Sequence, residues 1–223
     1  TMEGGISLGV GEPDFVTAWN VREASILSLE QGYTSYTANA GLLSLRKEIS
    51  AYLNKRFHLD YAPDDELIVT VGASQALDIA VRAILDPGEE VLIPEPCFVA
   101  YEALVSLAGG KAVHIHTNAE RGFKASAADF EAVLTERTKA IILCTPSNPT
   151  GSVYSKKELE EIAAFAEKHD LIVIADEIYA ELTYDEAYTS FAEIAGMKKR
   201  TILISGFRSE EHTSELQSHT EIS

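Results

Sequence analysis

The sequence predicts an α/β fold, built on a mainly parallel sheet with helices on both faces. The first observation is a run of apolar, mostly β-branched residues at 171–174, which is typical of a strand buried on both faces. The second is a regular alternation of strand-length apolar runs and helical segments from residue 67 onward, as in βαβ units. The third is that small and polar residues directly follow these runs, where open α/β sheets bind ligands.

The elements can be taken in order along the chain. Residues 6–14 are expected to be extended and to run into a Gly/Pro turn, and residues 32–41 form a loop of small and aromatic residues. Helical spacing is found at residues 21–29, 44–57, 74–85, 98–107, 127–134 and 156–169. Besides the run that begins at Leu171, five runs have strand length: residues 67–71, 90–93, 112–115, 140–144 and 201–204.

Composition limits the partners of the protein. A net charge of −17 over 223 residues argues against binding to nucleic acid or to an anionic membrane surface. Cys97 and Cys144 lie in or beside apolar runs, which indicates a reducing, cytoplasmic compartment and no disulfide framework. We see no apolar run as long as a membrane span and no signal-peptide pattern in residues 1–5.

Asp176 follows the apolar run at 171–174 and is the first candidate functional residue. At the carboxyl end of a buried strand it would be a carboxylate on the floor of a cleft, with Tyr179 three residues further on. A buried carboxylate is costly unless it has a partner, and a protonated ring nitrogen is one such partner. The alternative is that Asp176 caps a following helix.

Further candidates follow other strands. Gly72, Ala73 and Ser74 open a helix, so that free N–H groups and the helix dipole could bind a phosphate. A plain strand–helix turn with a serine cap fits the same residues. Phe98 could stack on a flat heterocycle or belong to the core.

Asn148 lies between two prolines and could donate to a ligand oxygen or form an Asx turn. Either Asn148–Pro149 or Glu95–Pro96 could be a cis peptide bond. His114 and His116 alternate with apolar neighbours, and we interpret them as one face of a strand. No carboxylate or cysteine stands at ligand spacing, so a metal site is not expected.

Six motifs, in this order and spacing, resemble the class I/II aminotransferases, which are fold-type I enzymes dependent on pyridoxal 5′-phosphate (PLP). The resemblance covers about residues 6–207, and the set is far more specific than any single motif. The motifs are Gly11-Glu12-Pro13-Asp14, Tyr36 to Gly41, Gly72-Ala73-Ser74-Gln75-Ala76, Ser147-Asn148-Pro149-Thr150-Gly151, Asp176-Glu177-Ile178-Tyr179 and Ser205-Gly206-Phe207.

The resemblance implies a role for each candidate. Asp176 would pair with the pyridine nitrogen of PLP and keep it protonated. Asn148 and Tyr179 would hydrogen-bond the phenolate oxygen, and Phe98 would stack on the ring. The phosphate would be bound by Ala73, Ser74 and Ser205, together with Tyr36 of the other subunit. Val10 and Gly11 would lie beside the substrate carboxylate.

The chain departs from the family after Phe207. The family continues with Ser-Lys, and that lysine forms the Schiff base, whereas Arg208 and Ser209 stand here. An arginine stays protonated and cannot act as the nucleophilic amine. Lysines that precede strands are expected roughly 20 Å from the carboxyl edge, at about 3.3 Å per residue; these are Lys111, Lys139, Lys198 and Lys199. No catalytic residue is therefore assigned.

Residues 208–223 have no apolar period, and within them we interpret Arg208 to His219 as translated sequencing adapter rather than as part of a disordered native tail. The chain then divides into an amino-terminal segment, 1–35, a PLP-binding large domain, 36–207, that is incomplete, and the tail. Most of the small domain is missing.

The expected function is that of an amino-terminal fragment of an aminotransferase, which moves an amino group between an amino acid and a 2-oxo acid. The parent protein would be a homodimer. The chain itself is expected to be inactive and to bind PLP weakly, without a covalent bond, because the Schiff-base lysine is absent. A PLP-dependent β-lyase on the same scaffold and a non-catalytic protein of this fold are the alternatives.

Overall fold

The computed structural model describes residues 16–184 and 187–206. The extended segment expected at residues 6–14, the candidates Val10 and Gly11, and the tail at 208–223 lie outside these ranges. Among the described residues, no helix combines the length and the apolar character needed to cross a bilayer.

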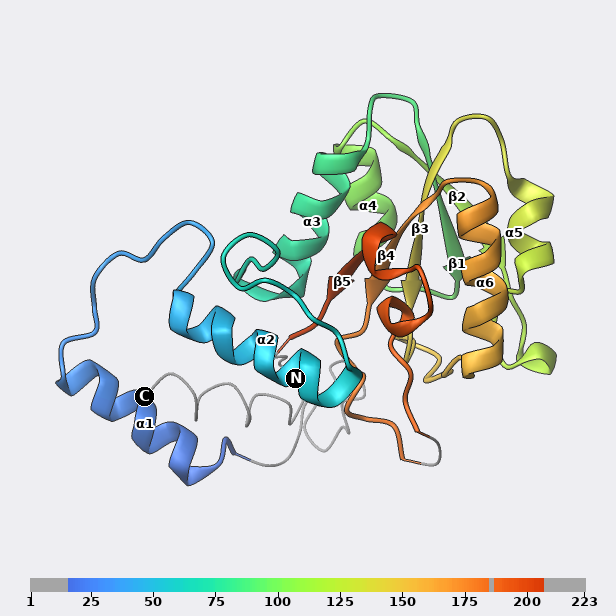
Figure 1. Ribbon diagram of the computed structural model, residues 1–223. Helices are drawn as coiled ribbons and strands as arrows, with labels where there is room; N and C mark the ends of the chain where they lie inside the picture. The colour runs from blue at the N-terminus through green and yellow to red at the C-terminus, as the bar shows by residue number, and fades with distance from the viewer. Residues whose placement is uncertain (1–15, 185–186, 207–223) are drawn as a thin grey trace, which may run out of the picture.

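The described residues form a five-stranded sheet of order β2-β1-β3-β4-β5, in which all neighbouring strands are parallel (Figure 1). The strands are β1 (Glu90–Glu95), β2 (Lys111–His116), β3 (Thr138–Cys144), β4 (Ile172–Asp176) and β5 (Thr201–Ile204). In the register, Cys144 lies beside Asp176, and Asp176 lies beside Ile204. The carboxyl ends of β3, β4 and β5 therefore meet at one edge, and the predicted parallel sheet is confirmed.

Helices cover both faces of the sheet, as predicted. On one face lie α3 (Gly72–Ile84) and α4 (Ala100–Leu107), and on the other lie α5 (Ala127–Val133) and α6 (Lys156–Lys168) (Figure 1). The chain enters through α1 (Trp19–Glu30) and α2 (Leu43–Phe57), and α1 stands apart from the sheet layers. Three short 3₁₀ turns complete the described elements: η1 (Ala119–Arg121), η2 (Phe191–Glu193) and η3 (Lys198–Arg200).

Alternating side chains of each strand fill two cores. Val91 and Ile93 pack with α3 and α4, whereas Leu92 packs with α5 and α6. Because successive side chains of a strand point to opposite faces, a strand covered on both sides is apolar at every position. This geometry explains why the central strands appear in the sequence as unbroken apolar runs.

The strand predicted at residues 67–71 is wrong. Val69 N–H donates to the Ala40 carbonyl at 3.0 Å, but no strand pairs with this segment in the part of the chain that the structure describes. Ile68 and Val71 are 64% and 89% exposed. A strand is stable only where neighbours satisfy its backbone groups and cover its side chains, so apolar pattern alone does not produce one.

Replacement of Phe130 by alanine tests the core between α5 and α6. Phe130 is fully buried and stacks on Phe165, with ring centroids 5.7 Å apart. Phe130→Ala should lower the free energy of unfolding by about 3–5 kcal/mol, because the cavity cannot collapse fully. Urea denaturation measures this loss. Leu107→Ala, at an exposed position of α4, is the matched control and should cost about 0.5 kcal/mol or less. Equal losses in the two variants would contradict the assigned core.

Candidate functional site

Asp176 ends β4 at the carboxyl edge of the sheet and is 4% exposed. The Tyr101 hydroxyl donates to its Oδ2 at 2.6 Å, and the Ile178 N–H points at Oδ1 from 3.4 Å. Burial raises the pKa of Asp176, and these two donors partly oppose the rise. The residues after Asp176 form turns rather than a helix, so the helix-cap alternative is wrong. The carboxyl group is thus oriented, buried and suited to a cationic partner.

Asn148 and Tyr179 form a pair beside this carboxyl group. The amide Nδ2 of Asn148 donates to the Tyr179 hydroxyl at 3.2 Å, and both side chains are partly buried. The side chain therefore bonds across the edge rather than forming an Asx turn. The loop that carries Asn148 is held by a bond from Gly151 N–H to the Ser147 carbonyl at 2.8 Å, and Gly151 has a φ of +70° that favours glycine.

The peptide bonds before three prolines at this edge are cis. Two of them, Glu95–Pro96 and Asn148–Pro149, were the candidates from sequence, and the third is Thr145–Pro146. The first precedes Phe98, whose ring meets Tyr101 edge-on at 5.7 Å between centroids. Phe98 is partly buried and packs against the core, next to the tyrosine that bonds Asp176.

The amino end of α3 forms the next part of the edge. Gly72 has a φ of +76°, and no side chain caps the helix within the described residues. Ala73 is partly buried and Ser74 is exposed, so the serine-cap alternative is wrong. Helix N–H groups that lack a cap, together with the helix dipole, can hold an anion. Ser205 follows β5 and is exposed.

Tyr36 is not brought to this edge by its own chain. Its side chain is fully exposed on the connection between α1 and α2. The remaining sequence candidates, Val10 and Gly11, lie outside the described residues. One copy of the chain therefore gathers seven of the ten candidate residues on the carboxyl side of the sheet: Ala73, Ser74, Phe98, Asn148, Asp176, Tyr179 and Ser205.

The lysines considered as substitutes for a Schiff-base lysine lie at the opposite edge. Lys111 begins β2, Lys139 is the second residue of β3, and Lys198 and Lys199 belong to η3 directly before β5. Lys198 and Lys199 therefore precede their strand, as predicted, whereas Lys111 and Lys139 are the first and second residues of theirs.

His114 and His116 lie on one face of β2, as predicted. Their Nδ1 atoms are 2.8 and 2.9 Å from the two oxygens of Glu95 at the end of the neighbouring strand. Sequence spacing could not show this carboxylate, because it is brought in by strand pairing. Within the described ranges, no group of three or more His, Cys, Asp or Glu side chains could hold a metal ion.

Two buried residues of the edge were not singled out from sequence. Tyr101 lies in the apolar face of α4, where a tyrosine hydroxyl must find a partner, and this requirement is the signal that could have revealed it. The second is Glu177, which is 1% exposed. It directly follows Asp176, and two acidic residues after a buried strand are unusual enough to have drawn attention.

Comparisons with known proteins agree with this geometry. The model of the family described as aminotransferase class I and II matches residues 3–207. The chain is 79% identical over 207 residues to YugH of Bacillus subtilis, a protein provisionally named as an aminotransferase. The match covers 93% of this chain and 54% of YugH. It is 47% identical to an aspartate aminotransferase of Pyrococcus abyssi, over 91% of this chain and 52% of that protein.

A solved structure shows the same fold. The crystal structure of an aromatic aminotransferase from Pyrococcus horikoshii superposes with a TM-score of 0.89 at 40% identity, covering 97% of this chain and 62% of that one. The chain thus spans about half the length of the curated relatives that it matches.

Replacement of Tyr101 by phenylalanine tests the environment of Asp176. The hydroxyl lowers the pKa of Asp176 by donating to its ionised form, so Tyr101→Phe should raise that pKa further. Carboxyl-carbon NMR titration of the 223-residue chain measures the change. Tyr184→Phe, at an exposed position, is the control and should leave Asp176 as it is. A lower pKa of Asp176 in Tyr101→Phe would show that the hydroxyl does not act as its donor.

Proposed function

Since the chain belongs to the class I and II aminotransferase family, whose members depend on PLP, we propose that it forms the cofactor-binding part of an enzyme that transfers an amino group between an amino acid and a 2-oxo acid. The observation that carries this proposal is Asp176, a carboxyl group buried at the carboxyl edge, with Tyr101 as donor and the Asn148–Tyr179 pair beside it. Residues 36–207 would be the PLP-binding domain, and a cytoplasmic location fits its two free cysteines.

The residues present fit the cofactor. A buried carboxyl group with a raised pKa gains most from a partner that carries a positive charge, which is what a protonated pyridine nitrogen offers. Asp176 would hold that nitrogen, Asn148 and Tyr179 would bind the phenolate oxygen, and Phe98 would cover the ring. When bound, PLP supplies an electron sink for the bonds of the amino acid that are broken.

The amino end of α3 would hold the phosphate group. Ala73 and Ser74 would contribute backbone N–H groups and the serine hydroxyl, and Ser205 would contribute from the end of β5. Helix N–H groups are suited to a dianion because the amino end of a helix also carries the positive end of the helix dipole. Val10 and Gly11 would lie beside the substrate carboxylate.

This chain would bind PLP reversibly and would not turn over. Arg208 and Ser209 stand where the family has Ser-Lys, and Lys111, Lys139, Lys198 and Lys199 lie at the amino ends of strands, at the opposite edge. Relatives of similar identity carry the names of aspartate and aromatic-amino-acid aminotransferases. We therefore assign the shared amino-group transfer and no particular substrate side chain.

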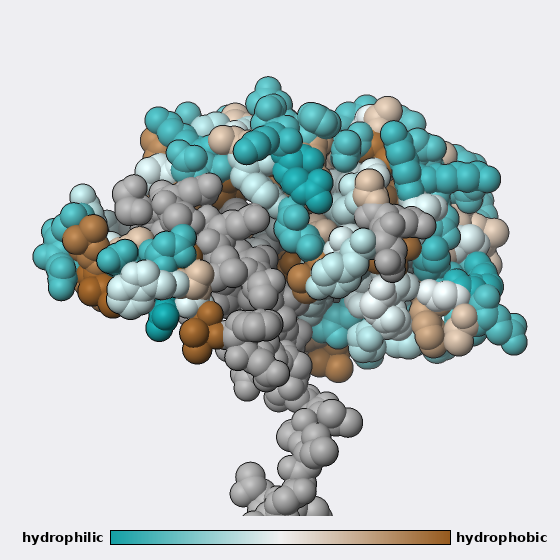
Figure 2. Space-filling view, turned by 90° about the horizontal axis from the view of Figure 1, so that it is seen from below, coloured by the Kyte–Doolittle hydropathy of each residue, from teal (hydrophilic) through white to brown (hydrophobic). Residues whose placement is uncertain are grey.

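A homodimer would supply Tyr36 to the site of the other copy. The side chains of Trp19, Ile26, Leu29 and Tyr33 are all more than half exposed. Figure 2 shows apolar surface on the lobe at the left, where α1 lies in Figure 1. Large exposed apolar side chains in one segment favour burial against a partner. This segment continues into Tyr36, so that a contact made by α1 would place the tyrosine at an interface.

Replacement of Asp176 by asparagine tests the cofactor site. Pyridoxine 5′-phosphate is the probe, because its alcohol cannot react with surface lysines as the aldehyde of PLP does. Asp176→Asn should raise the dissociation constant of this probe about 10- to 100-fold, since a hydrogen bond between charged groups is lost. Isothermal titration calorimetry measures it.

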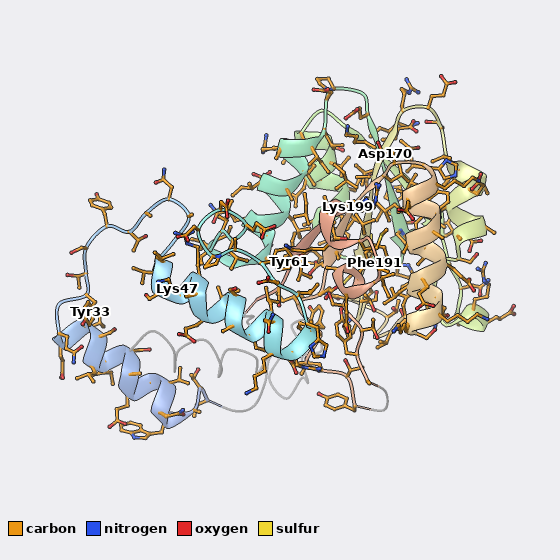
Figure 3. All side chains as sticks on the ribbon, viewed as in Figure 1. Tyr33, Lys47, Tyr61, Asp170, Phe191 and Lys199 are labelled. Atoms are coloured by element: carbon orange, nitrogen blue, oxygen red, sulfur yellow. The ribbon has the colours of Figure 1, made fainter. Side chains whose placement is uncertain are left out.

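The control is Asp170→Asn, which removes an exposed carboxylate before β4 at the opposite edge (Figure 3) and should leave the dissociation constant unchanged. Equal binding to wild type and Asp176→Asn would overturn the assignment of Asp176 to the pyridine nitrogen.

A second variant tests the homodimer. Trp19→Ser combined with Ile26→Ser should weaken self-association at least about 10-fold, as expected when central apolar contacts of an interface are removed. Sedimentation velocity over a concentration series gives the dimer constant. Leu107→Ser, also exposed but on α4, should leave the constant unchanged. A wild-type chain that stays monomeric at all concentrations would contradict the proposed role of α1.

A further inference from the structure

Glu181 ties the turn that carries Tyr179 to α2, a helix that lies far away in the sequence. One oxygen of its carboxylate, Oε1, accepts a hydrogen bond from the Tyr52 hydroxyl and another, at 3.0 Å, from Nε of Arg56. These two partners precede Glu181 by 129 and 125 residues. None of the roles proposed above uses this carboxylate, although Tyr179 is only two residues away in the sequence.

The turn between Tyr179 and Leu182 connects the position of Glu181 to that of Tyr179. The Leu182 N–H donates to the Tyr179 carbonyl at 2.9 Å, and the Ala180 N–H donates to the Glu177 carbonyl at 3.0 Å. Ala180 is buried in the same core cluster as the apolar face of α2. Because hydrogen bonds close both turns, the backbone has little freedom there, and an anchor on Glu181 also fixes the backbone of Tyr179.

α2 also supports the other member of the Asn148–Tyr179 pair, by a separate contact. Phe57, the last residue of α2, meets the Tyr188 ring edge-on, with 5.9 Å between the centroids. The Tyr188 hydroxyl donates to the carbonyl of Thr145, a fully buried residue three positions before Asn148, at 2.9 Å. Figure 1 shows the carboxyl end of α2 beside the segment that follows β4. One end of this helix thus supports both backbone segments from which the pair is built.

The two donors to Glu181 keep their protons at neutral pH. Burial of Tyr52, together with its hydrogen bond to Glu181, raises the pKa of the phenol. The guanidinium group of Arg56 is always charged and can only donate. The side chains of Arg56 and Glu181 are 41% and 30% exposed, and an ion pair this exposed adds little to global stability. The effect of the contact is therefore expected in the local geometry of the turn.

We propose that Glu181 is a positioning residue of the cofactor site, which keeps the Tyr179 hydroxyl within hydrogen-bond distance of the Asn148 amide. It does so by fastening the turn of Tyr179 to α2 through Tyr52 and Arg56. The Asn148–Tyr179 distance of 3.2 Å is at the long end for a hydrogen bond, so a small displacement of the turn breaks it. The value of this geometry for PLP rests on the proposed function, whereas the geometry itself does not.

Hydrogen exchange of the Asn148 side-chain amide reports on the pair without any ligand, and NMR of the 223-residue chain measures it. In Glu181→Ala this exchange should be about 3- to 10-fold faster than in wild type, because the hydrogen bond to Tyr179 is weakened. In Glu181→Gln it should stay within about twofold of wild type, since the amide oxygen still accepts from both donors. Glu48→Ala, which removes an exposed carboxylate from α2 itself, is the control and should leave the exchange unchanged.

Two outcomes would overturn the positioning role. One is an exchange rate of the Asn148 amide in Glu181→Ala equal to that in wild type. The other is an exchange rate in Glu181→Gln as fast as in Glu181→Ala, because the effect would then come from the lost charge and not from the hydrogen bonds.

Tyr52→Phe removes one donor and leaves the carboxylate in place. Alone, it should speed the exchange of the Asn148 amide about 2- to 5-fold. Combined with Glu181→Ala it should add nothing to the effect of that substitution, because the phenol acts through Glu181. Tyr52→Phe keeps the aromatic ring, so it tests the proposal even if Glu181→Ala does not fold. Additive effects of the two substitutions would contradict the anchor.

Binding of pyridoxine 5′-phosphate separates this inference from the proposed function. If both hold, Glu181→Ala should raise the dissociation constant of this probe about 3- to 10-fold, and Glu181→Gln should restore it. Absence of binding by wild type, together with the expected exchange, would reject the cofactor site and retain the role of Glu181 in the Asn148–Tyr179 pair. Normal binding by wild type, with an Asn148 exchange that Glu181→Ala does not change, would do the reverse.

Discussion

A carboxyl group buried at the end of β4 is the constraint on which the carboxyl edge depends. Asp176 is almost fully buried, and burial of a charge is costly unless donors or a cation compensate for it. Tyr101 on α4, which precedes Asp176 by 75 residues in the sequence, supplies one donor. Glu177 cannot hold a second charge next to it at low cost, because its own surroundings favour the neutral form. The edge therefore places the carboxyl group of Asp176 at a defined position.

The parallel register makes this arrangement possible. Since β3, β4 and β5 end level with one another, groups from separate parts of the chain meet at Asp176. The two faces of the sheet then have different tasks. The face covered by α3 and α4 brings Tyr101, Phe98 and the free end of α3, which are the groups that would contact a cofactor. On the other side, the segment from Tyr188 to Phe191 supports the backbone of the same edge.

Much of this could be predicted from sequence because it depends on local pattern. Apolar runs predicted five of the strands. The positions directly after strand ends predicted Asp176, Asn148 and Phe98 as site residues, because parallel strands end at the same edge of the sheet. The partner of Asp176 could not be predicted. In the sequence Tyr101 looks like any tyrosine of a helix core, and only its hydrogen bond to Asp176, which is distant in the sequence, sets it apart. Residues 67–71 have a strand pattern, yet pairing is a property of neighbours and not of the segment.

Apolar exposure is concentrated beside the polar chemistry. Ile68 and Val71 directly precede the free end of α3, and the exposed side chains of α1 lead to Tyr36. Away from this region, the central strands and the apolar face of α6 are buried in the core. An interaction between a carboxylate and a cation strengthens as water is excluded, so covering these apolar segments would also strengthen the partner that Asp176 takes. The carboxyl group at the end of β4 and the exposed apolar segments therefore serve the same end, because covering these segments would exclude water from the site.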